Sequence, residues 1–236
     1  MISIKGLRKK FGPLTVLDDI DLDIPSGQAT GIVGPNGSGK TTTIKALLGL
    51  VKPNAGDIHI DGESIKGQWD YRKKIGYMPQ IARYPENMTV RELFNFIKEV
   101  RGATQTNEKE LIEYFGLQPE LEKRMRTLSG GNRQKVGAVL ATMFDPEVLI
   151  FDEPTAGLDP HASVQFKNFV HREKEKGKTV LLTTHIMSEI EELADFLIFI
   201  VEGKIRYHGP MKELIKKQKE QRLEGAVAKM MAEVAA

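Results

Sequence analysis

One stretch of the sequence, residues 34–41, has the residue types that hold phosphate groups. It reads Gly-Pro-Asn-Gly-Ser-Gly-Lys-Thr, which fits the P-loop pattern G-x-x-x-x-G-K-[ST]. Glycines let the backbone wrap closely around phosphate oxygens, because they tolerate φ > 0 and carry no side chain. We expect Lys40 to reach the β- and γ-phosphates of a nucleotide and Thr41 to offer its hydroxyl to Mg²⁺. The predicted phosphate contacts are Gly34, Asn36, Gly37, Ser38, Gly39, Lys40, Thr41 and Thr42.

A pair of carboxylates, Asp152 and Glu153, follows an apolar run over residues 148–151. Such a run is typical of a strand buried on both faces, and open α/β sheets bind ligands at the carboxyl ends of their strands. Asp152 suits Mg²⁺ ligation, and Glu153 could orient and polarise an attacking water. The alternative is a pair of exposed acids with no role beyond the strand end.

A second possible anion site lies at residues 128–134, Leu-Ser-Gly-Gly-Asn-Arg-Gln, which open a helical pattern. Ser129 could be an ordinary N-cap with glycines in the turn. The same helix N-terminus could also receive a phosphate, through Ser129, Gly130 and Gly131. The residues alone leave both interpretations open.

Four further positions each have a structural and a functional interpretation. Phe11 lies in a turn and could pack in the interior or stack on an adenine ring. Asp159 precedes a proline and looks like the N-cap of a helix. His185 ends an apolar strand and could be structural or contact a γ-phosphate. Gln80 stands where a strand should stop and, without context, is an ordinary loop residue.

These residues need strands and helices to bring them together. Strands are expected within residues 2–33, 52–78, 179–185 and 196–208. A helix is expected after the P-loop, on the spacing of Ile44, Leu47, Leu48 and Val51. Further helices are expected at 89–100, 107–115, 119–125 and 160–176, and from residue 211 as one charged amphipathic tail that frays by 236. Residues 81–143 therefore look like a helical subdomain within a strand-rich chain.

The helix over 89–100 has the clearest start signal. Thr89 followed by Glu92 predicts a capping box. The apolar residues that fall on one face are Val90, Leu93, Phe94, Ile97 and Val100.

Composition narrows the class of protein. Among 236 residues, 34 are basic and 32 acidic, and a net charge of +2 is too balanced for a nucleic-acid footprint. The sequence has no cysteine, which excludes disulfides, Cys-ligated zinc and iron–sulfur ligation within it. The first residues, 1–5, do not have the layout of a signal peptide. The most continuous apolar run, 196–201, is far short of the ~20 residues of a spanning helix. We therefore expect a soluble protein whose membrane role, if any, comes through a partner.

Taken in order, these motifs resemble those of ATP-binding cassette (ABC) ATPases, the nucleotide-binding subunits of ABC transporters. The matching segments are the Walker A loop at 34–41, the Q-loop at Gln80, the signature at 128–132, the Walker B strand at 148–153, the D-loop at 156–159 and the switch histidine at His185. The resemblance covers residues 1 to about 210, which predicts an ABC ATPase domain over 1–210 and a helical tail over 211–236.

The resemblance implies an α/β fold: a P-loop NTPase core of ABC ATPase type, an N-terminal antiparallel β region and an inserted α-helical subdomain. It implies ATP and Mg²⁺ as ligands and ATP hydrolysis coupled to transport. Two such subunits, expected as a homodimer, would close head-to-tail around two ATP molecules, each site pairing one P-loop with the other chain's signature. The partners would be integral membrane permease subunits, with the protein on the inner, cytoplasmic face of the cell membrane and no nucleic acid involved.

The resemblance also assigns roles. It implies catalytic roles for Glu153, His185, Gln80 and Asp159, metal contacts from Thr41, Gln80 and Asp152, and adenine stacking by Phe11. Asn132 replaces the usual glutamine of the signature, and Phe11 replaces the common tyrosine. Residues 77–90 are similar to the Q-loop region of ABC-2-type exporters, and within these to the copper-processing ATPase of nitrous oxide reductase maturation. Without cysteine or a His-rich cluster to bind copper, cargo would be selected by partner subunits.

Three other functions compete with a transporter subunit. A soluble ABC ATPase without a membrane partner, such as an iron–sulfur assembly subunit, is the main alternative. An ABC protein acting on DNA or ribosomes would be expected to carry a coiled-coil insertion, a zinc module or two cassettes, which this sequence does not show. A nucleotide-binding regulator without turnover fits poorly with Glu153 and His185 both in place.

Overall fold

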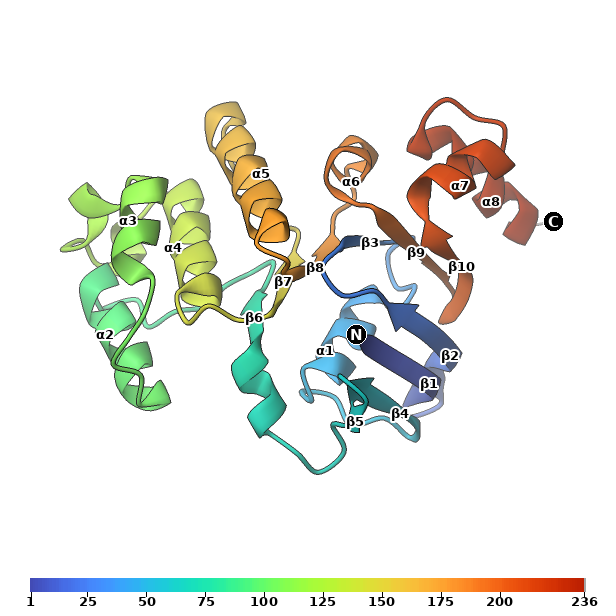
Figure 1. Ribbon diagram of the computed structural model, residues 1–236, viewed down its shortest axis with the longest axis horizontal. Helices are drawn as coiled ribbons and strands as arrows, with labels where there is room; N and C mark the ends of the chain where they lie inside the picture. Colours follow the sequence, from blue (N-terminus) through green and yellow to red (C-terminus); the bar gives the residue numbers. More distant parts are fainter. Residues whose placement is uncertain (236) are drawn as a thin grey trace.

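Two β-sheets and a separate group of helices make up the computed structural model, which describes residues 1–235 (Figure 1). The antiparallel sheet consists, in spatial order, of β2 (Leu14–Ile24), β1 (Ile2–Phe11), β4 (Ala55–Ile60) and β5 (Glu63–Ser64). The second sheet consists, in order, of β10 (Lys204–Pro210), β9 (Phe196–Val201), β3 (Ala29–Val33), β8 (Thr179–Thr183), β7 (Val148–Asp152) and β6 (Ile75–Met78).

The antiparallel sheet buries one face, as its alternating sequence requires. In β2 the buried side chains are Leu17, Ile20, Leu22 and Ile24. Ile4 of β1 pairs with Leu22 on one side and Ile58 of β4 on the other, so a row of aliphatic side chains crosses three strands. This face covers the core around the helix that follows the P-loop.

The second sheet is parallel from β9 to β6, with β10 antiparallel at its edge. All residues of β3, β7 and β8 are buried, because helices or the other sheet cover both faces. Asp152 pairs with Thr183 in the register of β7 and β8, so the carboxyl ends of these neighbouring strands lie side by side. This edge collects the polar residues that follow the strands.

Helices pack on both faces of the second sheet. Between the two sheets lies α1 (Lys40–Leu47), whose Ile44 and Leu47 belong to one apolar cluster with strands of both sheets. A second apolar cluster lies on the opposite face, where the covering helices are α4 (Gly130–Thr142), α5 (Pro160–Glu175) and α6 (Met187–Leu193). The expected continuation of α1 to Val51 is wrong: α1 spans Lys40–Leu47, and Gly49 ends it with a left-handed φ of 66°.

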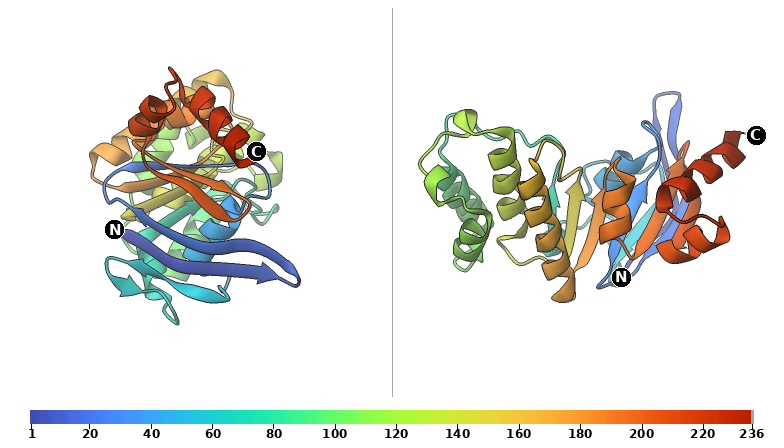
Figure 2. Two further views of the ribbon diagram at one scale, coloured as in Figure 1. Left: turned by 90° about the vertical axis from the view of Figure 1, so that its right-hand side faces the viewer. Right: turned by 90° about the horizontal axis from the view of Figure 1, so that it is seen from above.

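The helical subdomain extends from the core as a separate lobe (Figures 1 and 2). Its other helices are α2 (Val90–Arg101) and α3 (Glu108–Phe115). The capping box is confirmed, since Thr89 Oγ1 accepts from the Glu92 N–H at 3.1 Å and Glu92 Oε2 accepts from the Thr89 N–H at 2.8 Å. Val100 does not share the buried face as predicted and is 67% exposed, because α2 is buried mainly in its first half.

The predicted helix over 119–125 is wrong. The segment contains only short 3₁₀ turns, at Gln118–Glu120 and Met125–Thr127. The carbonyls of Leu121 and Lys123 instead accept hydrogen bonds from Arg91 and Val90 at the start of α2. Those donors have no partner within α2 itself, so the turns of this segment place its carbonyls where they satisfy the start of α2.

The tail contains two helices rather than the single expected one. These are α7 (Met211–Lys217) and α8 (Leu223–Ala235), and residue 236 of the predicted tail lies outside the described residues. Lys219 takes a left-handed φ of 53°, which ends α7. Leu223 and Met230 are then buried in the same apolar cluster as the core, so α8 folds back on the molecule near α6.

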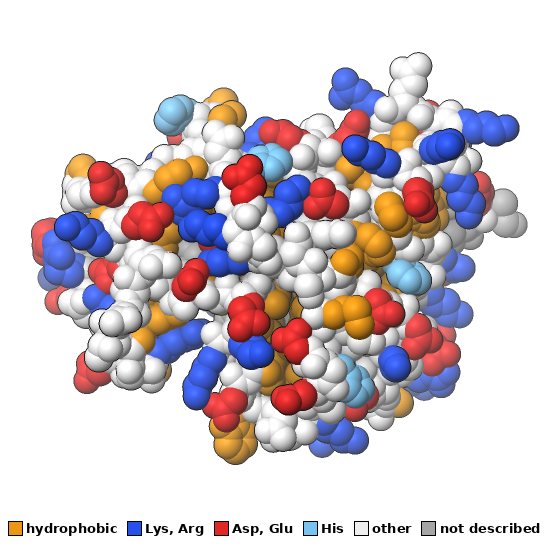
Figure 3. All heavy atoms as spheres, in the orientation of Figure 1, with side chains coloured by type: hydrophobic (Ala, Val, Ile, Leu, Met, Phe, Trp, Pro, Cys, Tyr) orange, Lys and Arg blue, Asp and Glu red, His pale blue; other side chains and the backbone are white. Residues whose placement is uncertain are grey.

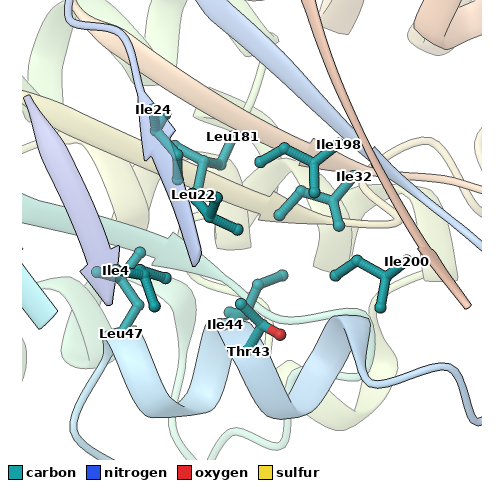
Figure 4. Close-up of a pocket in the computed structure, with 10 residues that line it drawn as sticks. All are labelled: Ile4, Leu22, Ile24, Ile32, Thr43, Ile44, Leu47, Leu181, Ile198 and Ile200. Carbon is teal, nitrogen blue, oxygen red and sulfur yellow. The ribbon is translucent and has the colours of Figure 1, made fainter. Parts of the chain in front are cut away.

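A small cavity of about 10 Å³ lies between α1 and the two sheets (Figure 4). Its lining is aliphatic except for Thr43, whose hydroxyl donates to the carbonyl of Gly39 at 3.0 Å. A space of this volume holds at most one water. The cavity is therefore a packing defect and not a ligand site.

The surface is mixed in charge. On the face shown in Figure 3, basic and acidic side chains are interspersed, in line with the small net charge. None of the helices described, the last of which ends at residue 235, combines the length and apolar character needed to cross a lipid bilayer.

Candidate functional site

An open pocket of about 750 Å³ lies where the loops after β3, β6, β7 and β8 meet. This is the edge at which open α/β sheets bind ligands. It is lined by Leu14, Val16, Asn36, Gly37, Ser38, Gly39, Lys40, Thr41, Thr42, Gln80, Asp152, Glu153 and His185. The structure therefore gathers four separate segments around one space: the P-loop from Asn36 to Thr42, Gln80, the pair Asp152 and Glu153, and His185. Gly34 belongs to the same loop but is not in the lining.

The P-loop backbone requires glycine at two tight places. Gly34 has a φ of 154°, and a Cβ there would lie 2.0 Å from the carbonyl oxygen of Ile200. Gly39 has a φ of 111°, and its Cβ would lie 2.7 Å from Leu17. The buried hydroxyl of Ser38 has no hydrogen-bond partner among the described residues, as expected of a loop that completes its hydrogen bonds with a ligand. The first N–H groups of α1 also lack partners within the helix and favour an anion.

Lys40 is the cation of the pocket. Its Nζ donates to the carbonyls of Gly34 at 2.7 Å and Pro35 at 3.0 Å, so the side chain folds back over the loop. Burial lowers the pKa of the ammonium, while Glu153 and Asp152 oppose this shift. A half-buried ammonium that bonds only neutral carbonyls and faces carboxylates gains further from a phosphate beside it.

Asp152 and Thr41 provide oxygen ligands suited to Mg²⁺. Asp152 is only 6% exposed, and its Oδ1 accepts a hydrogen bond from the hydroxyl of Thr183. Burial, and secondarily the charge of Asp152, raise the pKa of Tyr77 to about 12. Mg²⁺ in nucleotide sites takes one or two carboxylates together with phosphate oxygens and waters. One carboxylate, one hydroxyl and the amide oxygen of Gln80 in the same pocket fit that donor set.

Glu153 is held by residues from two other loops. Its Oε2 accepts from Gln80 Nε2 at 3.0 Å and lies 3.2 Å from His185 Nδ1. Glu153 has a left-handed φ of 50°, unusual for this residue type, and its N–H donates to the carbonyl of Thr183 at 2.9 Å. Such strained backbone persists only where the surroundings enforce it and is common at functional sites. Gln80, Glu153 and His185 thus form one hydrogen-bonded cluster.

The signature residues lie outside the pocket lining. Ser129 caps α4, its Oγ accepting from the Asn132 N–H at 3.2 Å, and both Ser129 and Gly130 are exposed. Gly131 likewise does not line the pocket. Within one chain, the structure does not bring the predicted phosphate contacts of the signature to the P-loop.

Asp159 and Phe11 also lie outside the lining. Asp159 is the N-cap of α5, accepting from the Ala162 N–H at 2.9 Å, and this bond is the largest cause that lowers the pKa of its carboxyl. Phe11 is 48% exposed at the end of β1, with the Lys9 ammonium 4.7 Å from its ring centroid. The predicted N-cap is confirmed, while adenine stacking by Phe11 stays a prediction.

Two lining residues, Leu14 and Val16, were not anticipated from the sequence. Both lie at the start of β2, beside the P-loop. Leu14 is 64% exposed, and an apolar residue at a strand start carries no signal that distinguishes a pocket wall from a core position.

Comparison with known proteins identifies the family. A family model described as "ABC transporter" matches residues 17–156, more than half of the chain. This chain belongs to the ABC transporter ATP-binding family. It is an ATPase subunit of that family, and the expected fold class is confirmed.

Relatives and solved structures agree with this assignment. The Nod factor export ATP-binding protein I of Ralstonia nicotianae is 37% identical over 91% of this chain and 68% of its own length. A lantibiotic transport ATP-binding protein of Streptococcus pyogenes is 33% identical over 87% of this chain and 89% of its own. A solved ATP-binding subunit of an ABC transporter superimposes with a TM-score of 0.90 at 28% identity, covering 98% of this chain and 99% of that one. A nucleotide-free ATP-binding cassette gives a TM-score of 0.80 at 25% identity, covering 92% and 94%.

Proposed function

We propose that this ABC subunit hydrolyses MgATP in the pocket between the P-loop and Glu153, as one half of a head-to-tail dimer that drives separately encoded membrane subunits. In this proposal residues 1–210 form the ATPase domain and 81–143 its helical subdomain. The observation that supports it best is the cluster of Gln80, Glu153 and His185 beside Lys40 in one pocket.

The pocket residues have different proposed roles in hydrolysis. Lys40, the loop N–H groups and the start of α1 bind and orient the phosphates. Thr41, Asp152 and Gln80 would hold Mg²⁺, which supplies neutralisation of charge on the phosphate oxygens when bound. Glu153 takes a proton from the attacking water. His185 and Gln80 keep its carboxylate in place, and His185 also lies where it can contact the terminal phosphate.

A dimer would complete the site, because the signature of one chain does not line that chain's own pocket. A helix N-terminus with an exposed serine and two glycines is suited to phosphate, yet Ser129 and its neighbours do not line the pocket of their own chain. A second copy related by a two-fold axis would place its signature over this pocket and take this chain's signature in return. Asp159, exposed at the start of α5, would then act across the dimer interface.

The coupling partner is a permease at the inner face of the cell membrane. The support comes from relatives named for transport: two are named above, and a bacitracin transport ATP-binding protein of Bacillus licheniformis is 36% identical over 93% of this chain and 72% of its own. These names favour export over a membrane-independent ATPase. Copper processing stays a prediction from residues 77–90. Within residues 1–235 no three His, Asp or Glu side chains gather to hold a metal ion, so in that case membrane subunits would handle the copper.

Replacing Glu153 with glutamine separates ATP binding from chemistry. The variant Glu153→Gln keeps the shape of the side chain but not a base, so ATP binding should persist while turnover falls at least ~10²-fold. ATP-dependent dimers should then accumulate in size-exclusion chromatography. Glu202→Gln is the matched control, because Glu202 has the same φ of 50° in an exposed turn that does not line the pocket. Near-normal turnover of Glu153→Gln would refute its role as the base.

A further inference from the structure

A carboxylate outside the pocket lining joins the two loops that carry Glu153 and His185. This is Glu189, in α6. Its Oε2 accepts from the hydroxyl of Thr155 at 2.7 Å and from that of Thr184 at 3.2 Å. Thr155 lies two residues after Glu153, and Thr184 directly precedes His185. One oxygen atom therefore connects the segment after β7 to the segment after β8.

The two threonines have little access to other partners. Each is 7% exposed, so each hydroxyl needs an acceptor within the protein. The Thr184 hydroxyl also accepts from the Ile186 N–H at 3.1 Å, which shapes the turn that presents His185. A carboxylate accepts but does not donate, so both hydroxyls must point toward it, and such charge-assisted bonds are about twice as strong as neutral ones.

The contact that these loops support is sensitive to small shifts. Glu153 Oε2 and His185 Nδ1 are 3.2 Å apart across two segments, and His185 is exposed enough to move. Glu153 also has a left-handed backbone that the surroundings must enforce. Thr183 restrains Glu153 on its N-terminal side, through bonds to its N–H. On the C-terminal side, the Ala156 N–H donates to the carbonyl of Glu153 within the same loop, and Glu189 ties this loop, through Thr155, to the loop that carries His185.

We propose that Glu189 is a positioning residue for ATP hydrolysis, which keeps Glu153 and His185 in contact by tying together the two loops that carry them. The inference rests on the proposed role of Glu153. Glu189 does not line the pocket, so its removal should reduce kcat and leave ATP binding intact.

The test compares Glu189→Ala, Glu189→Gln and Glu192→Ala in the full chain. Steady-state kinetics should show kcat lowered about tenfold or more for Glu189→Ala, since small misplacements of catalytic groups cost up to ~10²-fold. Its KM for ATP should stay near that of the wild type. Glu189→Gln keeps one acceptor oxygen but no charge, and should lose less. Glu192→Ala removes the same charge from the same helix, where Glu192 pairs with Lys167 at 2.6 Å, and should behave as wild type.

A second arm distinguishes positioning from a general loss of structure. In a His185→Ala chain, Glu189→Ala should lower the residual kcat by less than about twofold, because the contact it maintains is already gone. An unchanged kcat, a loss of ATP affinity in place of kcat, or the same loss in both backgrounds would overturn the inference. If Glu189→Ala does not fold, Glu189→Gln is compared in the two backgrounds, and an unchanged kcat or a loss of ATP affinity would overturn the inference. An active Glu153→Gln would refute the proposed function, whereas an inactive Glu153→Gln with a normal Glu189→Ala would refute only this inference.

Discussion

The P-loop edge of the core and the signature end of α4 have similar residue types but differ in their surroundings. Both begin a helix with glycines and hydroxyl side chains, the pattern that binds phosphate. At the P-loop the glycines have left-handed φ values, the Ser38 hydroxyl is buried with no hydrogen-bond partner in the part of the chain that the structure describes, and a half-buried lysine faces carboxylates. At α4, Ser129 is exposed, bonds its own helix and lines no part of the pocket.

On the proposed function, this difference means that the P-loop binds phosphate within its own chain and that the signature needs a partner surface. The P-loop has a pocket, a cation and the nearby hydrogen-bonded cluster of Gln80, Glu153 and His185. The signature has Ser129 and Gly130 on an exposed surface, outside the pocket lining. Substitutions that alter one region at a time test this difference.

The largest effect on nucleotide binding should come from Lys40→Ala. Without its ammonium the phosphates lose their only cationic side chain in the lining, so ATP affinity should fall at least about a hundredfold. Titration calorimetry of the full chain measures this directly. Lys45→Ala, which removes an exposed lysine from the same helix, is the control and should bind ATP normally. Unchanged affinity in Lys40→Ala would show that residues 34–41 do not form the phosphate site.

Ser129→Arg should have the opposite profile. ATP affinity should be unchanged at chain concentrations below those that give dimers, because Ser129 does not line the pocket. Turnover should nevertheless be lost, since a bulky cation at the start of α4 blocks its approach to the partner's nucleotide. The control is Ser26→Arg, at an exposed turn between β2 and β3. Weakened ATP binding in the isolated Ser129→Arg chain would remove the contrast between the two regions.

Local rules predicted much of this structure. The capping box at Thr89, the N-cap at Asp159 and the buried strand before Asp152 each depend on neighbours in sequence, and each is present. The motif order also predicted that the P-loop, Gln80, Glu153 and His185 meet in one pocket, because the carboxyl ends of parallel strands share one edge. Phe11 and Asp159, predicted for the same site, lie outside the lining. The roles assigned to those residues stay predictions.

Features that depend on distant backbone were not predictable in this way. The segment 119–125 is not a helix because its carbonyls serve the first turn of α2, some thirty residues earlier in the chain. The tail is interrupted at Lys219, which has a left-handed φ, and α8 folds back because Leu223 and Met230 are buried in the core cluster. Glu189 looks like an ordinary surface acid of an amphipathic helix until its two threonine partners are seen.

We expect each active site to combine the P-loop of one chain with the signature of another. Lys40→Ala and Ser129→Arg should each be inactive as homodimers. In a mixed dimer one site contains both lesions, while the other contains a normal Lys40 and a normal Ser129. The single measurement that tests the claim is therefore the ATPase rate of the two inactive variants after mixing.

Activity should return on mixing and peak near equal amounts, at no more than about a quarter of the wild-type rate, because about half of the dimers are mixed and each has one intact site. Mixed dimers can be verified by size-exclusion chromatography with ATP in a Glu153→Gln background. If mixed dimers form and the mixture stays inactive at every ratio, the shared-site account is contradicted.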